Sequence, residues 1–275
     1  MYPELTVFGL TIELYYAMYG VGVAAALVIG VLTAKRHRFS RLRTVVLTLV
    51  GFAFGVVGAK LMSYIYVYAL RWASRGAFVP DSSVCLFGAL LFLPVFLLPL
   101  SRLIRRPAGA LLDLLTPGNF VVLAFSKVGC TLGGCCFGVP AAHGIRTPYA
   151  AFTAFPVQPL EALSTFAVTA VLLVWLYRSD RRRTGDLYPM GMMLYCFCRF
   201  FWEHFRYYAQ PAEARFLGPL TFWQTVSLLS FIIGAVWMTA LYRKRPEIDF
   251  SDPRYAITAA EEEPPSDETA PSEPL

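Results

Sequence analysis

Seven long apolar stretches constrain this 275-residue sequence more than any other feature. A helix needs about 20 apolar residues to cross the hydrocarbon core of a bilayer. The stretches lie at about 10–34, 44–70, 84–100, 108–126, 157–177, 186–206 and 219–242. Hydrophobic residues make up 57% of the chain and charged residues 15%, which excludes a water-soluble domain. The sequence predicts an all-α integral membrane protein with seven transmembrane helices. The fourth is the weakest, because Pro117, Gly118 and Asn119 interrupt it.

The loops between these stretches differ in positive charge. The loops after the first, third, fifth and seventh stretches hold fifteen Lys and Arg residues, and the alternate loops hold six. Because basic residues accumulate in cytoplasmic loops, we expect the N-terminus outside and the C-terminus in the cytoplasm. The N-terminal segment has no basic start and no small-residue cleavage site, so it is predicted to be a retained span rather than a signal peptide.

The last thirty residues differ from the rest of the chain. From Glu247 onward there are nine acidic residues and one basic residue, among many Pro and Ser. Such a segment cannot bury enough apolar surface to fold alone. We therefore expect a seven-helix membrane domain at 1–245 and a disordered acidic cytoplasmic tail at 246–275.

Several ionisable side chains lie within the apolar stretches, where they are costly and usually functional. They are Glu13, Lys60, Asp113, Lys127, Glu161, Arg199, Glu203 and Arg206. In YCFCRFFWEHFR, Arg199, Glu203 and Arg206 are spaced by four and three residues, so a helix places them within about 60° of one face. They form either an ion-paired seam or a phosphate site in which Glu203 orients two guanidinium groups. His204 projects about 100° away from Glu203.

Two further stretches place charge beside unusual neighbours. In GFAFGVVGAK, the small residues Gly51 and Gly55 predict close helix packing, and Lys60 in mid-span requires a carboxylate or an anionic ligand. In FPVQPLEAL, Gln158 and Glu161 open the fifth stretch, where a carboxylate also suits the helix dipole. A structural and a functional role for Glu161 are both open.

The stretch SKVGCTLGGCCFG, residues 126–138, combines glycines with three cysteines. Cys130, Cys135 and Cys136 are expected on the outer face, where disulfides are permitted. Their C-x4-C-C spacing is not that of a standard zinc site, although His143 could add a fourth ligand, so no metal is predicted. The glycines can form a sharp turn that presents backbone N–H groups to an anion and holds Lys127 near it. The cysteines are then fillers or a local bridge.

Three motifs in this order, SKVGCTLGGCCFG, FPVQPLE and CRFFWEHFR, resemble the prolipoprotein diacylglyceryl transferase family, of which this chain looks like a divergent member. The resemblance covers about residues 10–243. It implies transfer of the diacylglyceryl group of phosphatidylglycerol to the lipobox cysteine of a preprolipoprotein, which forms a thioether and releases glycerol phosphate. It implies a multi-pass enzyme of the bacterial cytoplasmic (inner) membrane whose partners are these substrates and the bilayer. No cofactor and no nucleic acid are expected.

The resemblance also assigns roles to residues. The expected catalytic residues are Tyr15, Lys127, Arg199 and Glu203. The expected substrate-binding residues are Lys60, Gly129, Gly133, Gly134, Gly138, Gln158, Glu161 and Arg206. The family has histidines where this chain has Phe87 and Phe155, so the base that would deprotonate the acceptor thiol is missing from its usual place. A repurposed non-catalytic lipid-binding relative, a transferase with another acceptor, an outer-face thiol carrier and a transporter remain open alternatives.

Overall fold

The computed structural model describes residues 4–7, 10–37, 39–74, 85–178, 183–208 and 215–244, and the structural statements below refer to these residues. The predicted tail at 246–275 lies outside them. The helices are α1 (Leu14–Thr33), η1 (Ala34–His37), α2 (Arg41–Ser74), α3 (Leu86–Leu103), α4 (Ala108–Gly133), α5 (Val157–Arg178), α6 (Leu187–Glu203) and α8 (Phe222–Lys244). Three short hairpins are formed by β1 (Glu4–Val7) with β2 (Leu10–Glu13), β3 (Pro140–Arg146) with β4 (Thr153–Ala154), and β5 (Arg215–Leu217) with β6 (Leu220–Thr221).

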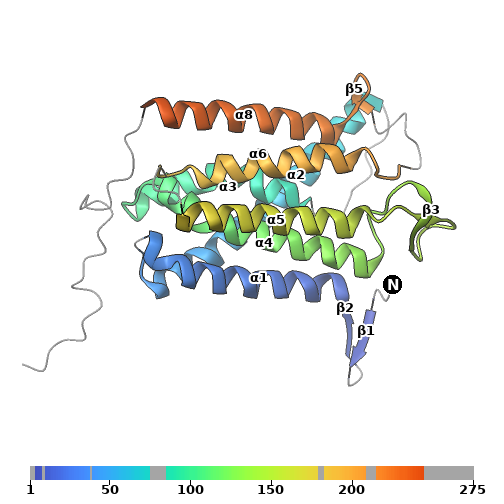
Figure 1. Ribbon diagram of the computed structural model, residues 1–275, viewed down its shortest axis with the longest axis horizontal. Coiled ribbons are helices and arrows are strands. Elements are labelled where there is room, and N and C mark those ends of the chain that lie inside the picture. Colours follow the sequence, from blue (N-terminus) through green and yellow to red (C-terminus); the bar gives the residue numbers. More distant parts are fainter. Residues whose placement is uncertain are drawn as a thin grey trace, which may run out of the picture.

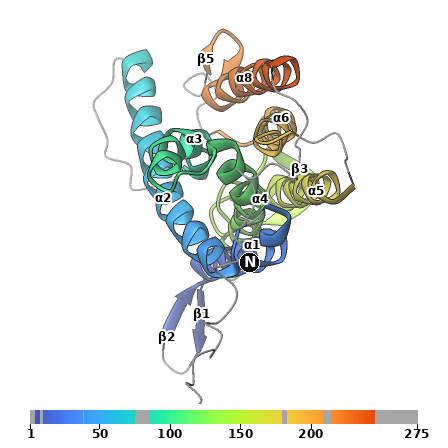
Figure 2. The same ribbon diagram turned by 90° about the vertical axis from the view of Figure 1, so that its left-hand side faces the viewer.

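The helices run side by side as a bundle, and α4 lies at its centre (Figure 2). It packs against α1, α2, α3, α5 and α6, whereas α8 packs on the outside of α6. In its most apolar window 72% of the residues of α4 are buried, compared with 28–39% in the other long apolar helices. The three hairpins lie at one end of the bundle (Figure 1). α4 is therefore the core around which the remaining helices are arranged.

Six described helices are long and apolar enough to cross a membrane: those that begin at Leu14, Arg41, Leu86, Ala108, Val157 and Phe222. α6, which falls in the sixth predicted stretch, has 17 residues and ends in charged side chains. The all-helical membrane class predicted from the sequence is thus supported. The seventh span and the direction of the termini stay predictions.

The fourth helix differs from its prediction. We expected a span at 108–126 interrupted at Pro117, but α4 continues through Pro117 as far as Gly133. The neighbours of a buried helix can compensate for the hydrogen bond that proline removes. Gly118 lies so close to α1 that an added Cβ would be 3.2 Å from the Cβ of Ala26. The first eight residues of SKVGCTLGGCCFG are therefore helical, and the turn begins only at Gly134.

The predicted close packing of the glycine-rich second helix is confirmed. A Cβ added at Gly58 would lie 2.8 Å from the carbonyl oxygen of Gly88 on α3. A Cβ added at Gly51 would lie 2.8 Å from Cδ1 of Leu115 on α4. α2 thus presents a smooth surface to both neighbours, as small residues do between membrane helices.

Asp113 stabilises the end of the bundle opposite the hairpins. Its Oδ2 accepts a hydrogen bond from the backbone N–H of Gly185 at 2.8 Å, and its Oδ1 accepts one from Leu187 at 3.1 Å. The side chain is buried, so it joins α4 to the first turn of α6. The ionisable Asp113 therefore has a structural task.

We expect Asp113→Ala to lower the melting temperature in detergent. It leaves two buried N–H groups without this acceptor, at a cost of about 1–3 kcal/mol each. Thermal unfolding of the purified protein measures the effect. Asp113→Asn keeps one acceptor oxygen, so its melting temperature should lie between those of the wild type and Asp113→Ala. An unchanged melting temperature for Asp113→Ala would contradict the capping role.

Candidate functional site

Glu161, in the second turn of α5, is the centre of a buried ion-pair network. Its Oε2 lies 2.8 Å from Nζ of Lys127 on α4 and 2.7 Å from Nη2 of Arg206. Its Oε1 forms an ion pair with Nη1 of Arg199 on α6. The residue is only 3% exposed. One carboxylate therefore holds three cations that come from two helices and from the turn after α6.

Glu203 is the second carboxylate of this network. Its Oε2 lies 2.9 Å from Nη2 of Arg199 and 3.3 Å from Nε of Arg206. Its Oε1 accepts a hydrogen bond from the Tyr208 hydroxyl. Burial, and then the negative charge of Glu203, raise the pKa of Tyr208, so this tyrosine stays a neutral donor. The buried Nε of Arg206 makes no hydrogen bond with any described residue.

The network carries more positive than negative charge. Three cations, Lys127, Arg199 and Arg206, face two carboxylates, Glu161 and Glu203. Buried charge is costly unless it is balanced. A ligand with a single negative charge would balance the excess positive charge of these five side chains. The arrangement is suited to binding one anionic group.

The chain keeps Arg206 in this network although α6 has already ended. We expected Arg199, Glu203 and Arg206 on one continuous helix, but α6 ends at Glu203. The N–H of Arg206 instead donates to the carbonyl of Glu203 at 3.2 Å, in a tighter turn than that of an α-helix. The prediction was wrong about the extent of the helix, and the predicted proximity of the three side chains is confirmed.

A backbone contact fixes this turn against the glycine-rich segment. Gly138 pairs with Arg206 as an antiparallel bridge, and the N–H of Val139 donates to the carbonyl of Phe205 at 2.9 Å. A Cβ added at Gly138 would lie 2.5 Å from the carbonyl oxygen of Phe155 and 2.9 Å from that of Phe205. Only glycine fits between the start of α5 and the end of α6.

Two pockets adjoin the network. A small one of about 170 Å³ is lined by Lys127, Glu161, Arg199 and neighbouring residues of α5 and α6. A larger and more open one of about 880 Å³ is lined by Glu203, Arg206 and Tyr208, and extends to β6 and α8. Charged residues of the network thus line both pockets.

The sequence of this chain matches one known protein family. A family model described as prolipoprotein diacylglyceryl transferase matches residues 3–240, nearly the whole chain. The chain belongs to this family. It is similar to the phosphatidylglycerol–prolipoprotein diacylglyceryl transferase of Clostridium tetani, with 25% identity over 236 residues that cover 82% of this chain and 92% of that protein. The divergent membership expected from the motifs is thus confirmed.

Two further relatives have the same kind of name. Transferase 2 of Clostridium perfringens is 23% identical over 209 residues, which cover 73% of this chain and 81% of that protein. The enzyme of Dehalococcoides mccartyi is 30% identical over 147 residues, which cover 51% of this chain and 56% of that protein. The similarity therefore extends over most of the membrane domain and is low throughout.

Phe87 and Phe155, which the resemblance sets at histidine positions of the family, make aromatic packing contacts. The ring of Phe87 is buried and makes an edge contact with Tyr195, with 5.5 Å between the centroids. The ring of Phe155 stacks on Phe205 at 5.0 Å. Phe87 is thus part of the core, whereas Phe155 is half-buried, and neither side chain can titrate.

The other histidines differ in their access to the site. His204, which the helical projection had placed away from the charged face, lines the larger pocket together with Glu203 and Arg206. Its Nδ1 lies 3.5 Å from Nε2 of Gln224. His204 directly follows the last residue of α6 and keeps right-handed helical dihedral angles. His143 is exposed on β3.

Tyr15 and Gln158 lie beside the network. Tyr15 packs against the last turns of α4, where a Cβ added at Gly129 would be 3.1 Å from its carbonyl oxygen and one at Gly133 would be 4.0 Å from its Cβ. Gln158 is buried and donates from Nε2 to the carbonyl of Cys135 at 2.9 Å. Both support the glycine-rich turn, and direct contact of either with a substrate stays a prediction.

Lys60 is placed differently from the other predicted cations. It is half-buried on α2, and this helix packs mainly against α3. The ion pairs described for Glu161 and Glu203 join α4, α5, α6 and the turn that follows α6, without Lys60. Its predicted role in substrate binding therefore stays a separate prediction.

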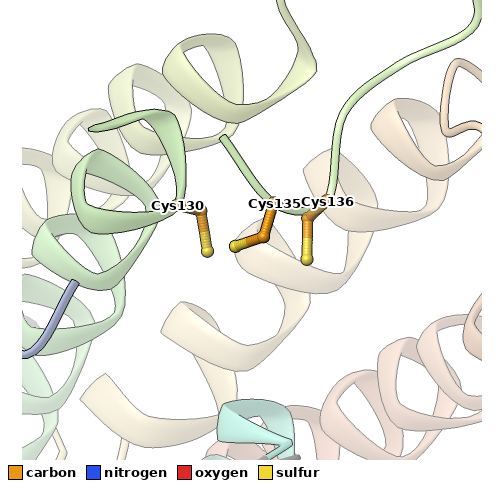
Figure 3. A group of neighbouring side chains, drawn as sticks. All are labelled: Cys130, Cys135 and Cys136. Carbon is orange, nitrogen blue, oxygen red and sulfur yellow. The ribbon is translucent and has the colours of Figure 1, made fainter. Parts of the chain in front are cut away.

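The three cysteines form a cluster at the end of α4 (Figure 3). The sulfur atoms of Cys130, Cys135 and Cys136 all lie within 4.8 Å of one another. Hydrogen bonds from Cys130 and then Cys135 lower the pKa of Cys136, and the positive charges of Arg206 and Lys127 add to this. The hydrogen bond from Cys130 lowers the pKa of Cys135, but Cys136 and burial outweigh it and raise that pKa to about 11.

We expect Cys136 to be the most reactive thiol of the reduced protein. It is exposed, whereas Cys130 is buried, and its lowered pKa keeps it as the thiolate below the ordinary thiol value of about 8.5. Iodoacetamide labelling followed by mass spectrometry, at several pH values, measures this. Cys136 should stay reactive as the pH falls, with the half-buried Cys198 as the control. A tenfold rate loss per pH unit below about 8 would contradict the shift.

Proposed function

We propose that this chain transfers the diacylglyceryl group of phosphatidylglycerol to the lipobox cysteine of a preprolipoprotein. The observation that carries the proposal is the buried set of three cations around Glu161 and Glu203 in a member of this family. A phosphodiester headgroup has one negative charge, which matches the excess positive charge of the network. The products are a thioether and glycerol phosphate.

The cations have a direct task in this reaction. When the bond between the glycerol carbon and the phosphate oxygen breaks, negative charge collects on the departing phosphate. Fixed donors that point at developing charge lower the barrier without reorganisation. Arg199, Arg206 and Lys127 are held in place by the two carboxylates, so we assign them to phosphate stabilisation. Glu161 and Glu203 are positioning residues.

We also propose how the chain lies in the membrane. α6 is the sixth of seven spans in chain order, the N-terminus is outside, and the domain 1–245 is followed by a cytoplasmic tail at 246–275. The arginine-rich connections after α1, α3 and α5 support this, because basic loops are cytoplasmic. The ion-pair network then lies in the outer half of a bacterial cytoplasmic membrane, near the hairpins.

A transfer assay tests the proposal. The purified protein would be mixed with phosphatidylglycerol and a lipobox peptide, and the peptide analysed by mass spectrometry. We expect a diacylglyceryl mass increment on the peptide cysteine, and none when that cysteine is replaced by serine. No increment, in a detergent in which a reference transferase is active, would instead favour a lipid-binding relative or another acceptor.

A further inference from the structure

We propose that Cys130, Cys135 and Cys136 bind a zinc ion whose open fourth position takes the acceptor thiol. This inference rests on the proposed function, because the acceptor is the cysteine of a preprolipoprotein. It extends that function by naming what activates the thiol in a chain that has Phe87 and Phe155 in place of two family histidines. The sequence alone predicted no metal here.

The distances suit a thiolate-bound zinc. Zinc binds cysteine sulfur at about 2.3 Å, so the sulfur atoms of a tetrahedral site lie about 3.8 Å apart. The three sulfur atoms already lie within 4.8 Å of one another, and in the view of Figure 3 the Cys135 sulfur lies between the other two. Small side-chain rotations close the remaining distance. Thiolates favour soft or borderline ions such as zinc over magnesium or calcium.

The backbone of the turn is held in the shape that gathers the thiols. Gly134 ends α4 with φ 78°, and Cys136 also has a left-handed φ of 57°. A non-glycine residue rarely adopts this conformation unless its surroundings impose it. Gln158 donates to the carbonyl of Cys135 at 2.9 Å, and Thr147 donates to that of Gly134 at 2.6 Å. Two buried side chains thus fix the turn on either side of the cluster.

The metal-bound state would be anionic and would lie next to two cations. Zinc with three thiolates has a net charge of −1, and an added acceptor thiolate makes it −2. Gly138, two residues after Cys136, pairs with Arg206, and Lys127 lies on α4 one turn before Cys130. The same two cations belong to the network around Glu161. The metal site and the phosphate site are therefore neighbours.

The reaction step balances without an oxidant. The acceptor thiol binds zinc and releases its proton to solvent, since zinc lowers the pKa of a bound group. The thiolate sulfur attacks the glycerol carbon of phosphatidylglycerol. A carbon–sulfur bond forms, the carbon–oxygen bond to the phosphate breaks, and glycerol phosphate leaves with the electron pair. The C-x4-C-C spacing differs from that of standard structural zinc sites, which are closed by four protein ligands.

Cobalt, a spectroscopic stand-in for zinc, tests metal binding. The full-length protein would be purified under reducing conditions, stripped with a chelator and titrated with Co²⁺. We expect a sulfur-to-cobalt charge-transfer band that saturates at one ion per chain, is lost in Cys130→Ser, Cys135→Ser and Cys136→Ser, and is unchanged in Cys198→Ser. Excess zinc should abolish the band. No band in the wild type, or a band that survives all three replacements, would overturn the site.

A lipobox peptide tests the open position. Adding it to the cobalt-loaded protein should shift the band, and the peptide with serine in place of cysteine should not. An unshifted band would refute acceptor binding at the metal. A disulfide between two of the three cysteines in protein purified under reducing conditions would refute the zinc site as well, because it would remove two of the three ligands.

The transfer assay separates this inference from the proposed function. Full transfer by the metal-stripped protein would overturn the zinc role and leave the transferase standing. A shift of the cobalt absorption band on peptide addition, without any diacylglyceryl transfer, would support the metal site and count against the proposed transfer reaction. With both correct, chelation abolishes transfer and added zinc restores it, while Cys198→Ser retains activity.

Discussion

Arg199→Ala is expected to lower kcat for diacylglyceryl transfer by about 100- to 1000-fold, the usual loss when one preorganised donor to developing charge is removed. Arg199 contacts both Glu161 and Glu203, as Arg206 also does. Its loss removes a donor to the phosphate and also leaves a buried carboxylate poorly compensated. Steady-state transfer to a lipobox peptide, followed by mass spectrometry, gives kcat and KM separately.

The control for this variant is Arg146→Ala, because Arg146 is an exposed arginine on β3 outside the network. It should retain wild-type transfer and melting temperature. Arg199→Lys keeps the charge but loses the paired donors, so we expect an intermediate kcat. If Arg199→Ala kept most of its turnover while remaining folded, the network would be a structural seam and the phosphate role would be wrong.

Gly138→Ala is expected to damage stability and activity together. The added Cβ would lie 2.5 Å from the carbonyl oxygen of Phe155 and 2.9 Å from that of Phe205. Both atoms belong to backbone, which cannot rotate away. Overpacking of this kind costs about 1–3 kcal/mol or more. Because Gly138 pairs with Arg206, the shift also moves a cation away from Glu161.

Melting temperature and transfer rate, measured on the same preparation, test this prediction. Gly20→Ala on α1 is the matched control, because a Cβ there would meet no atom within 4 Å. That variant should retain both properties. A Gly138→Ala protein with an unchanged melting temperature and full activity would show that the segments can separate without loss.

Local periodicity was enough to predict part of the site. The four- and three-residue spacing of Arg199, Glu203 and Arg206 brings them together whether the last turn is an α-helix or tighter. The apolar stretches likewise indicated the helices, since lipid leaves the backbone few alternatives. The sequence could not show that Glu161 rather than Glu203 gathers all three cations, because that depends on how α4, α5 and α6 pack.

Tertiary packing also explains where the predictions failed. Pro117 suggested a break, but its helix is enclosed by neighbours and stays continuous. The C-x4-C-C spacing did not show that the three cysteine sulfur atoms lie within 4.8 Å of one another, because this proximity depends on two left-handed residues in the turn. The continuity of α4 depends on contacts with segments distant in sequence, and the cysteine cluster depends on local backbone conformation.

The central position of α4 has a consequence for biosynthesis. This helix carries Asp113, Lys127 and Pro117, so inserting it into lipid without its neighbours would be energetically costly. The partners of these charged side chains come later in the chain. Glu161, which pairs with Lys127, lies near the start of α5, and the two backbone N–H groups that donate to Asp113 lie just before α6 and at its start. The ribosome thus delivers the core of the bundle before the parts that neutralise it. A chain halted after α4 would expose two unmatched charges, so the insertion machinery must shelter this segment until α5 and α6 emerge.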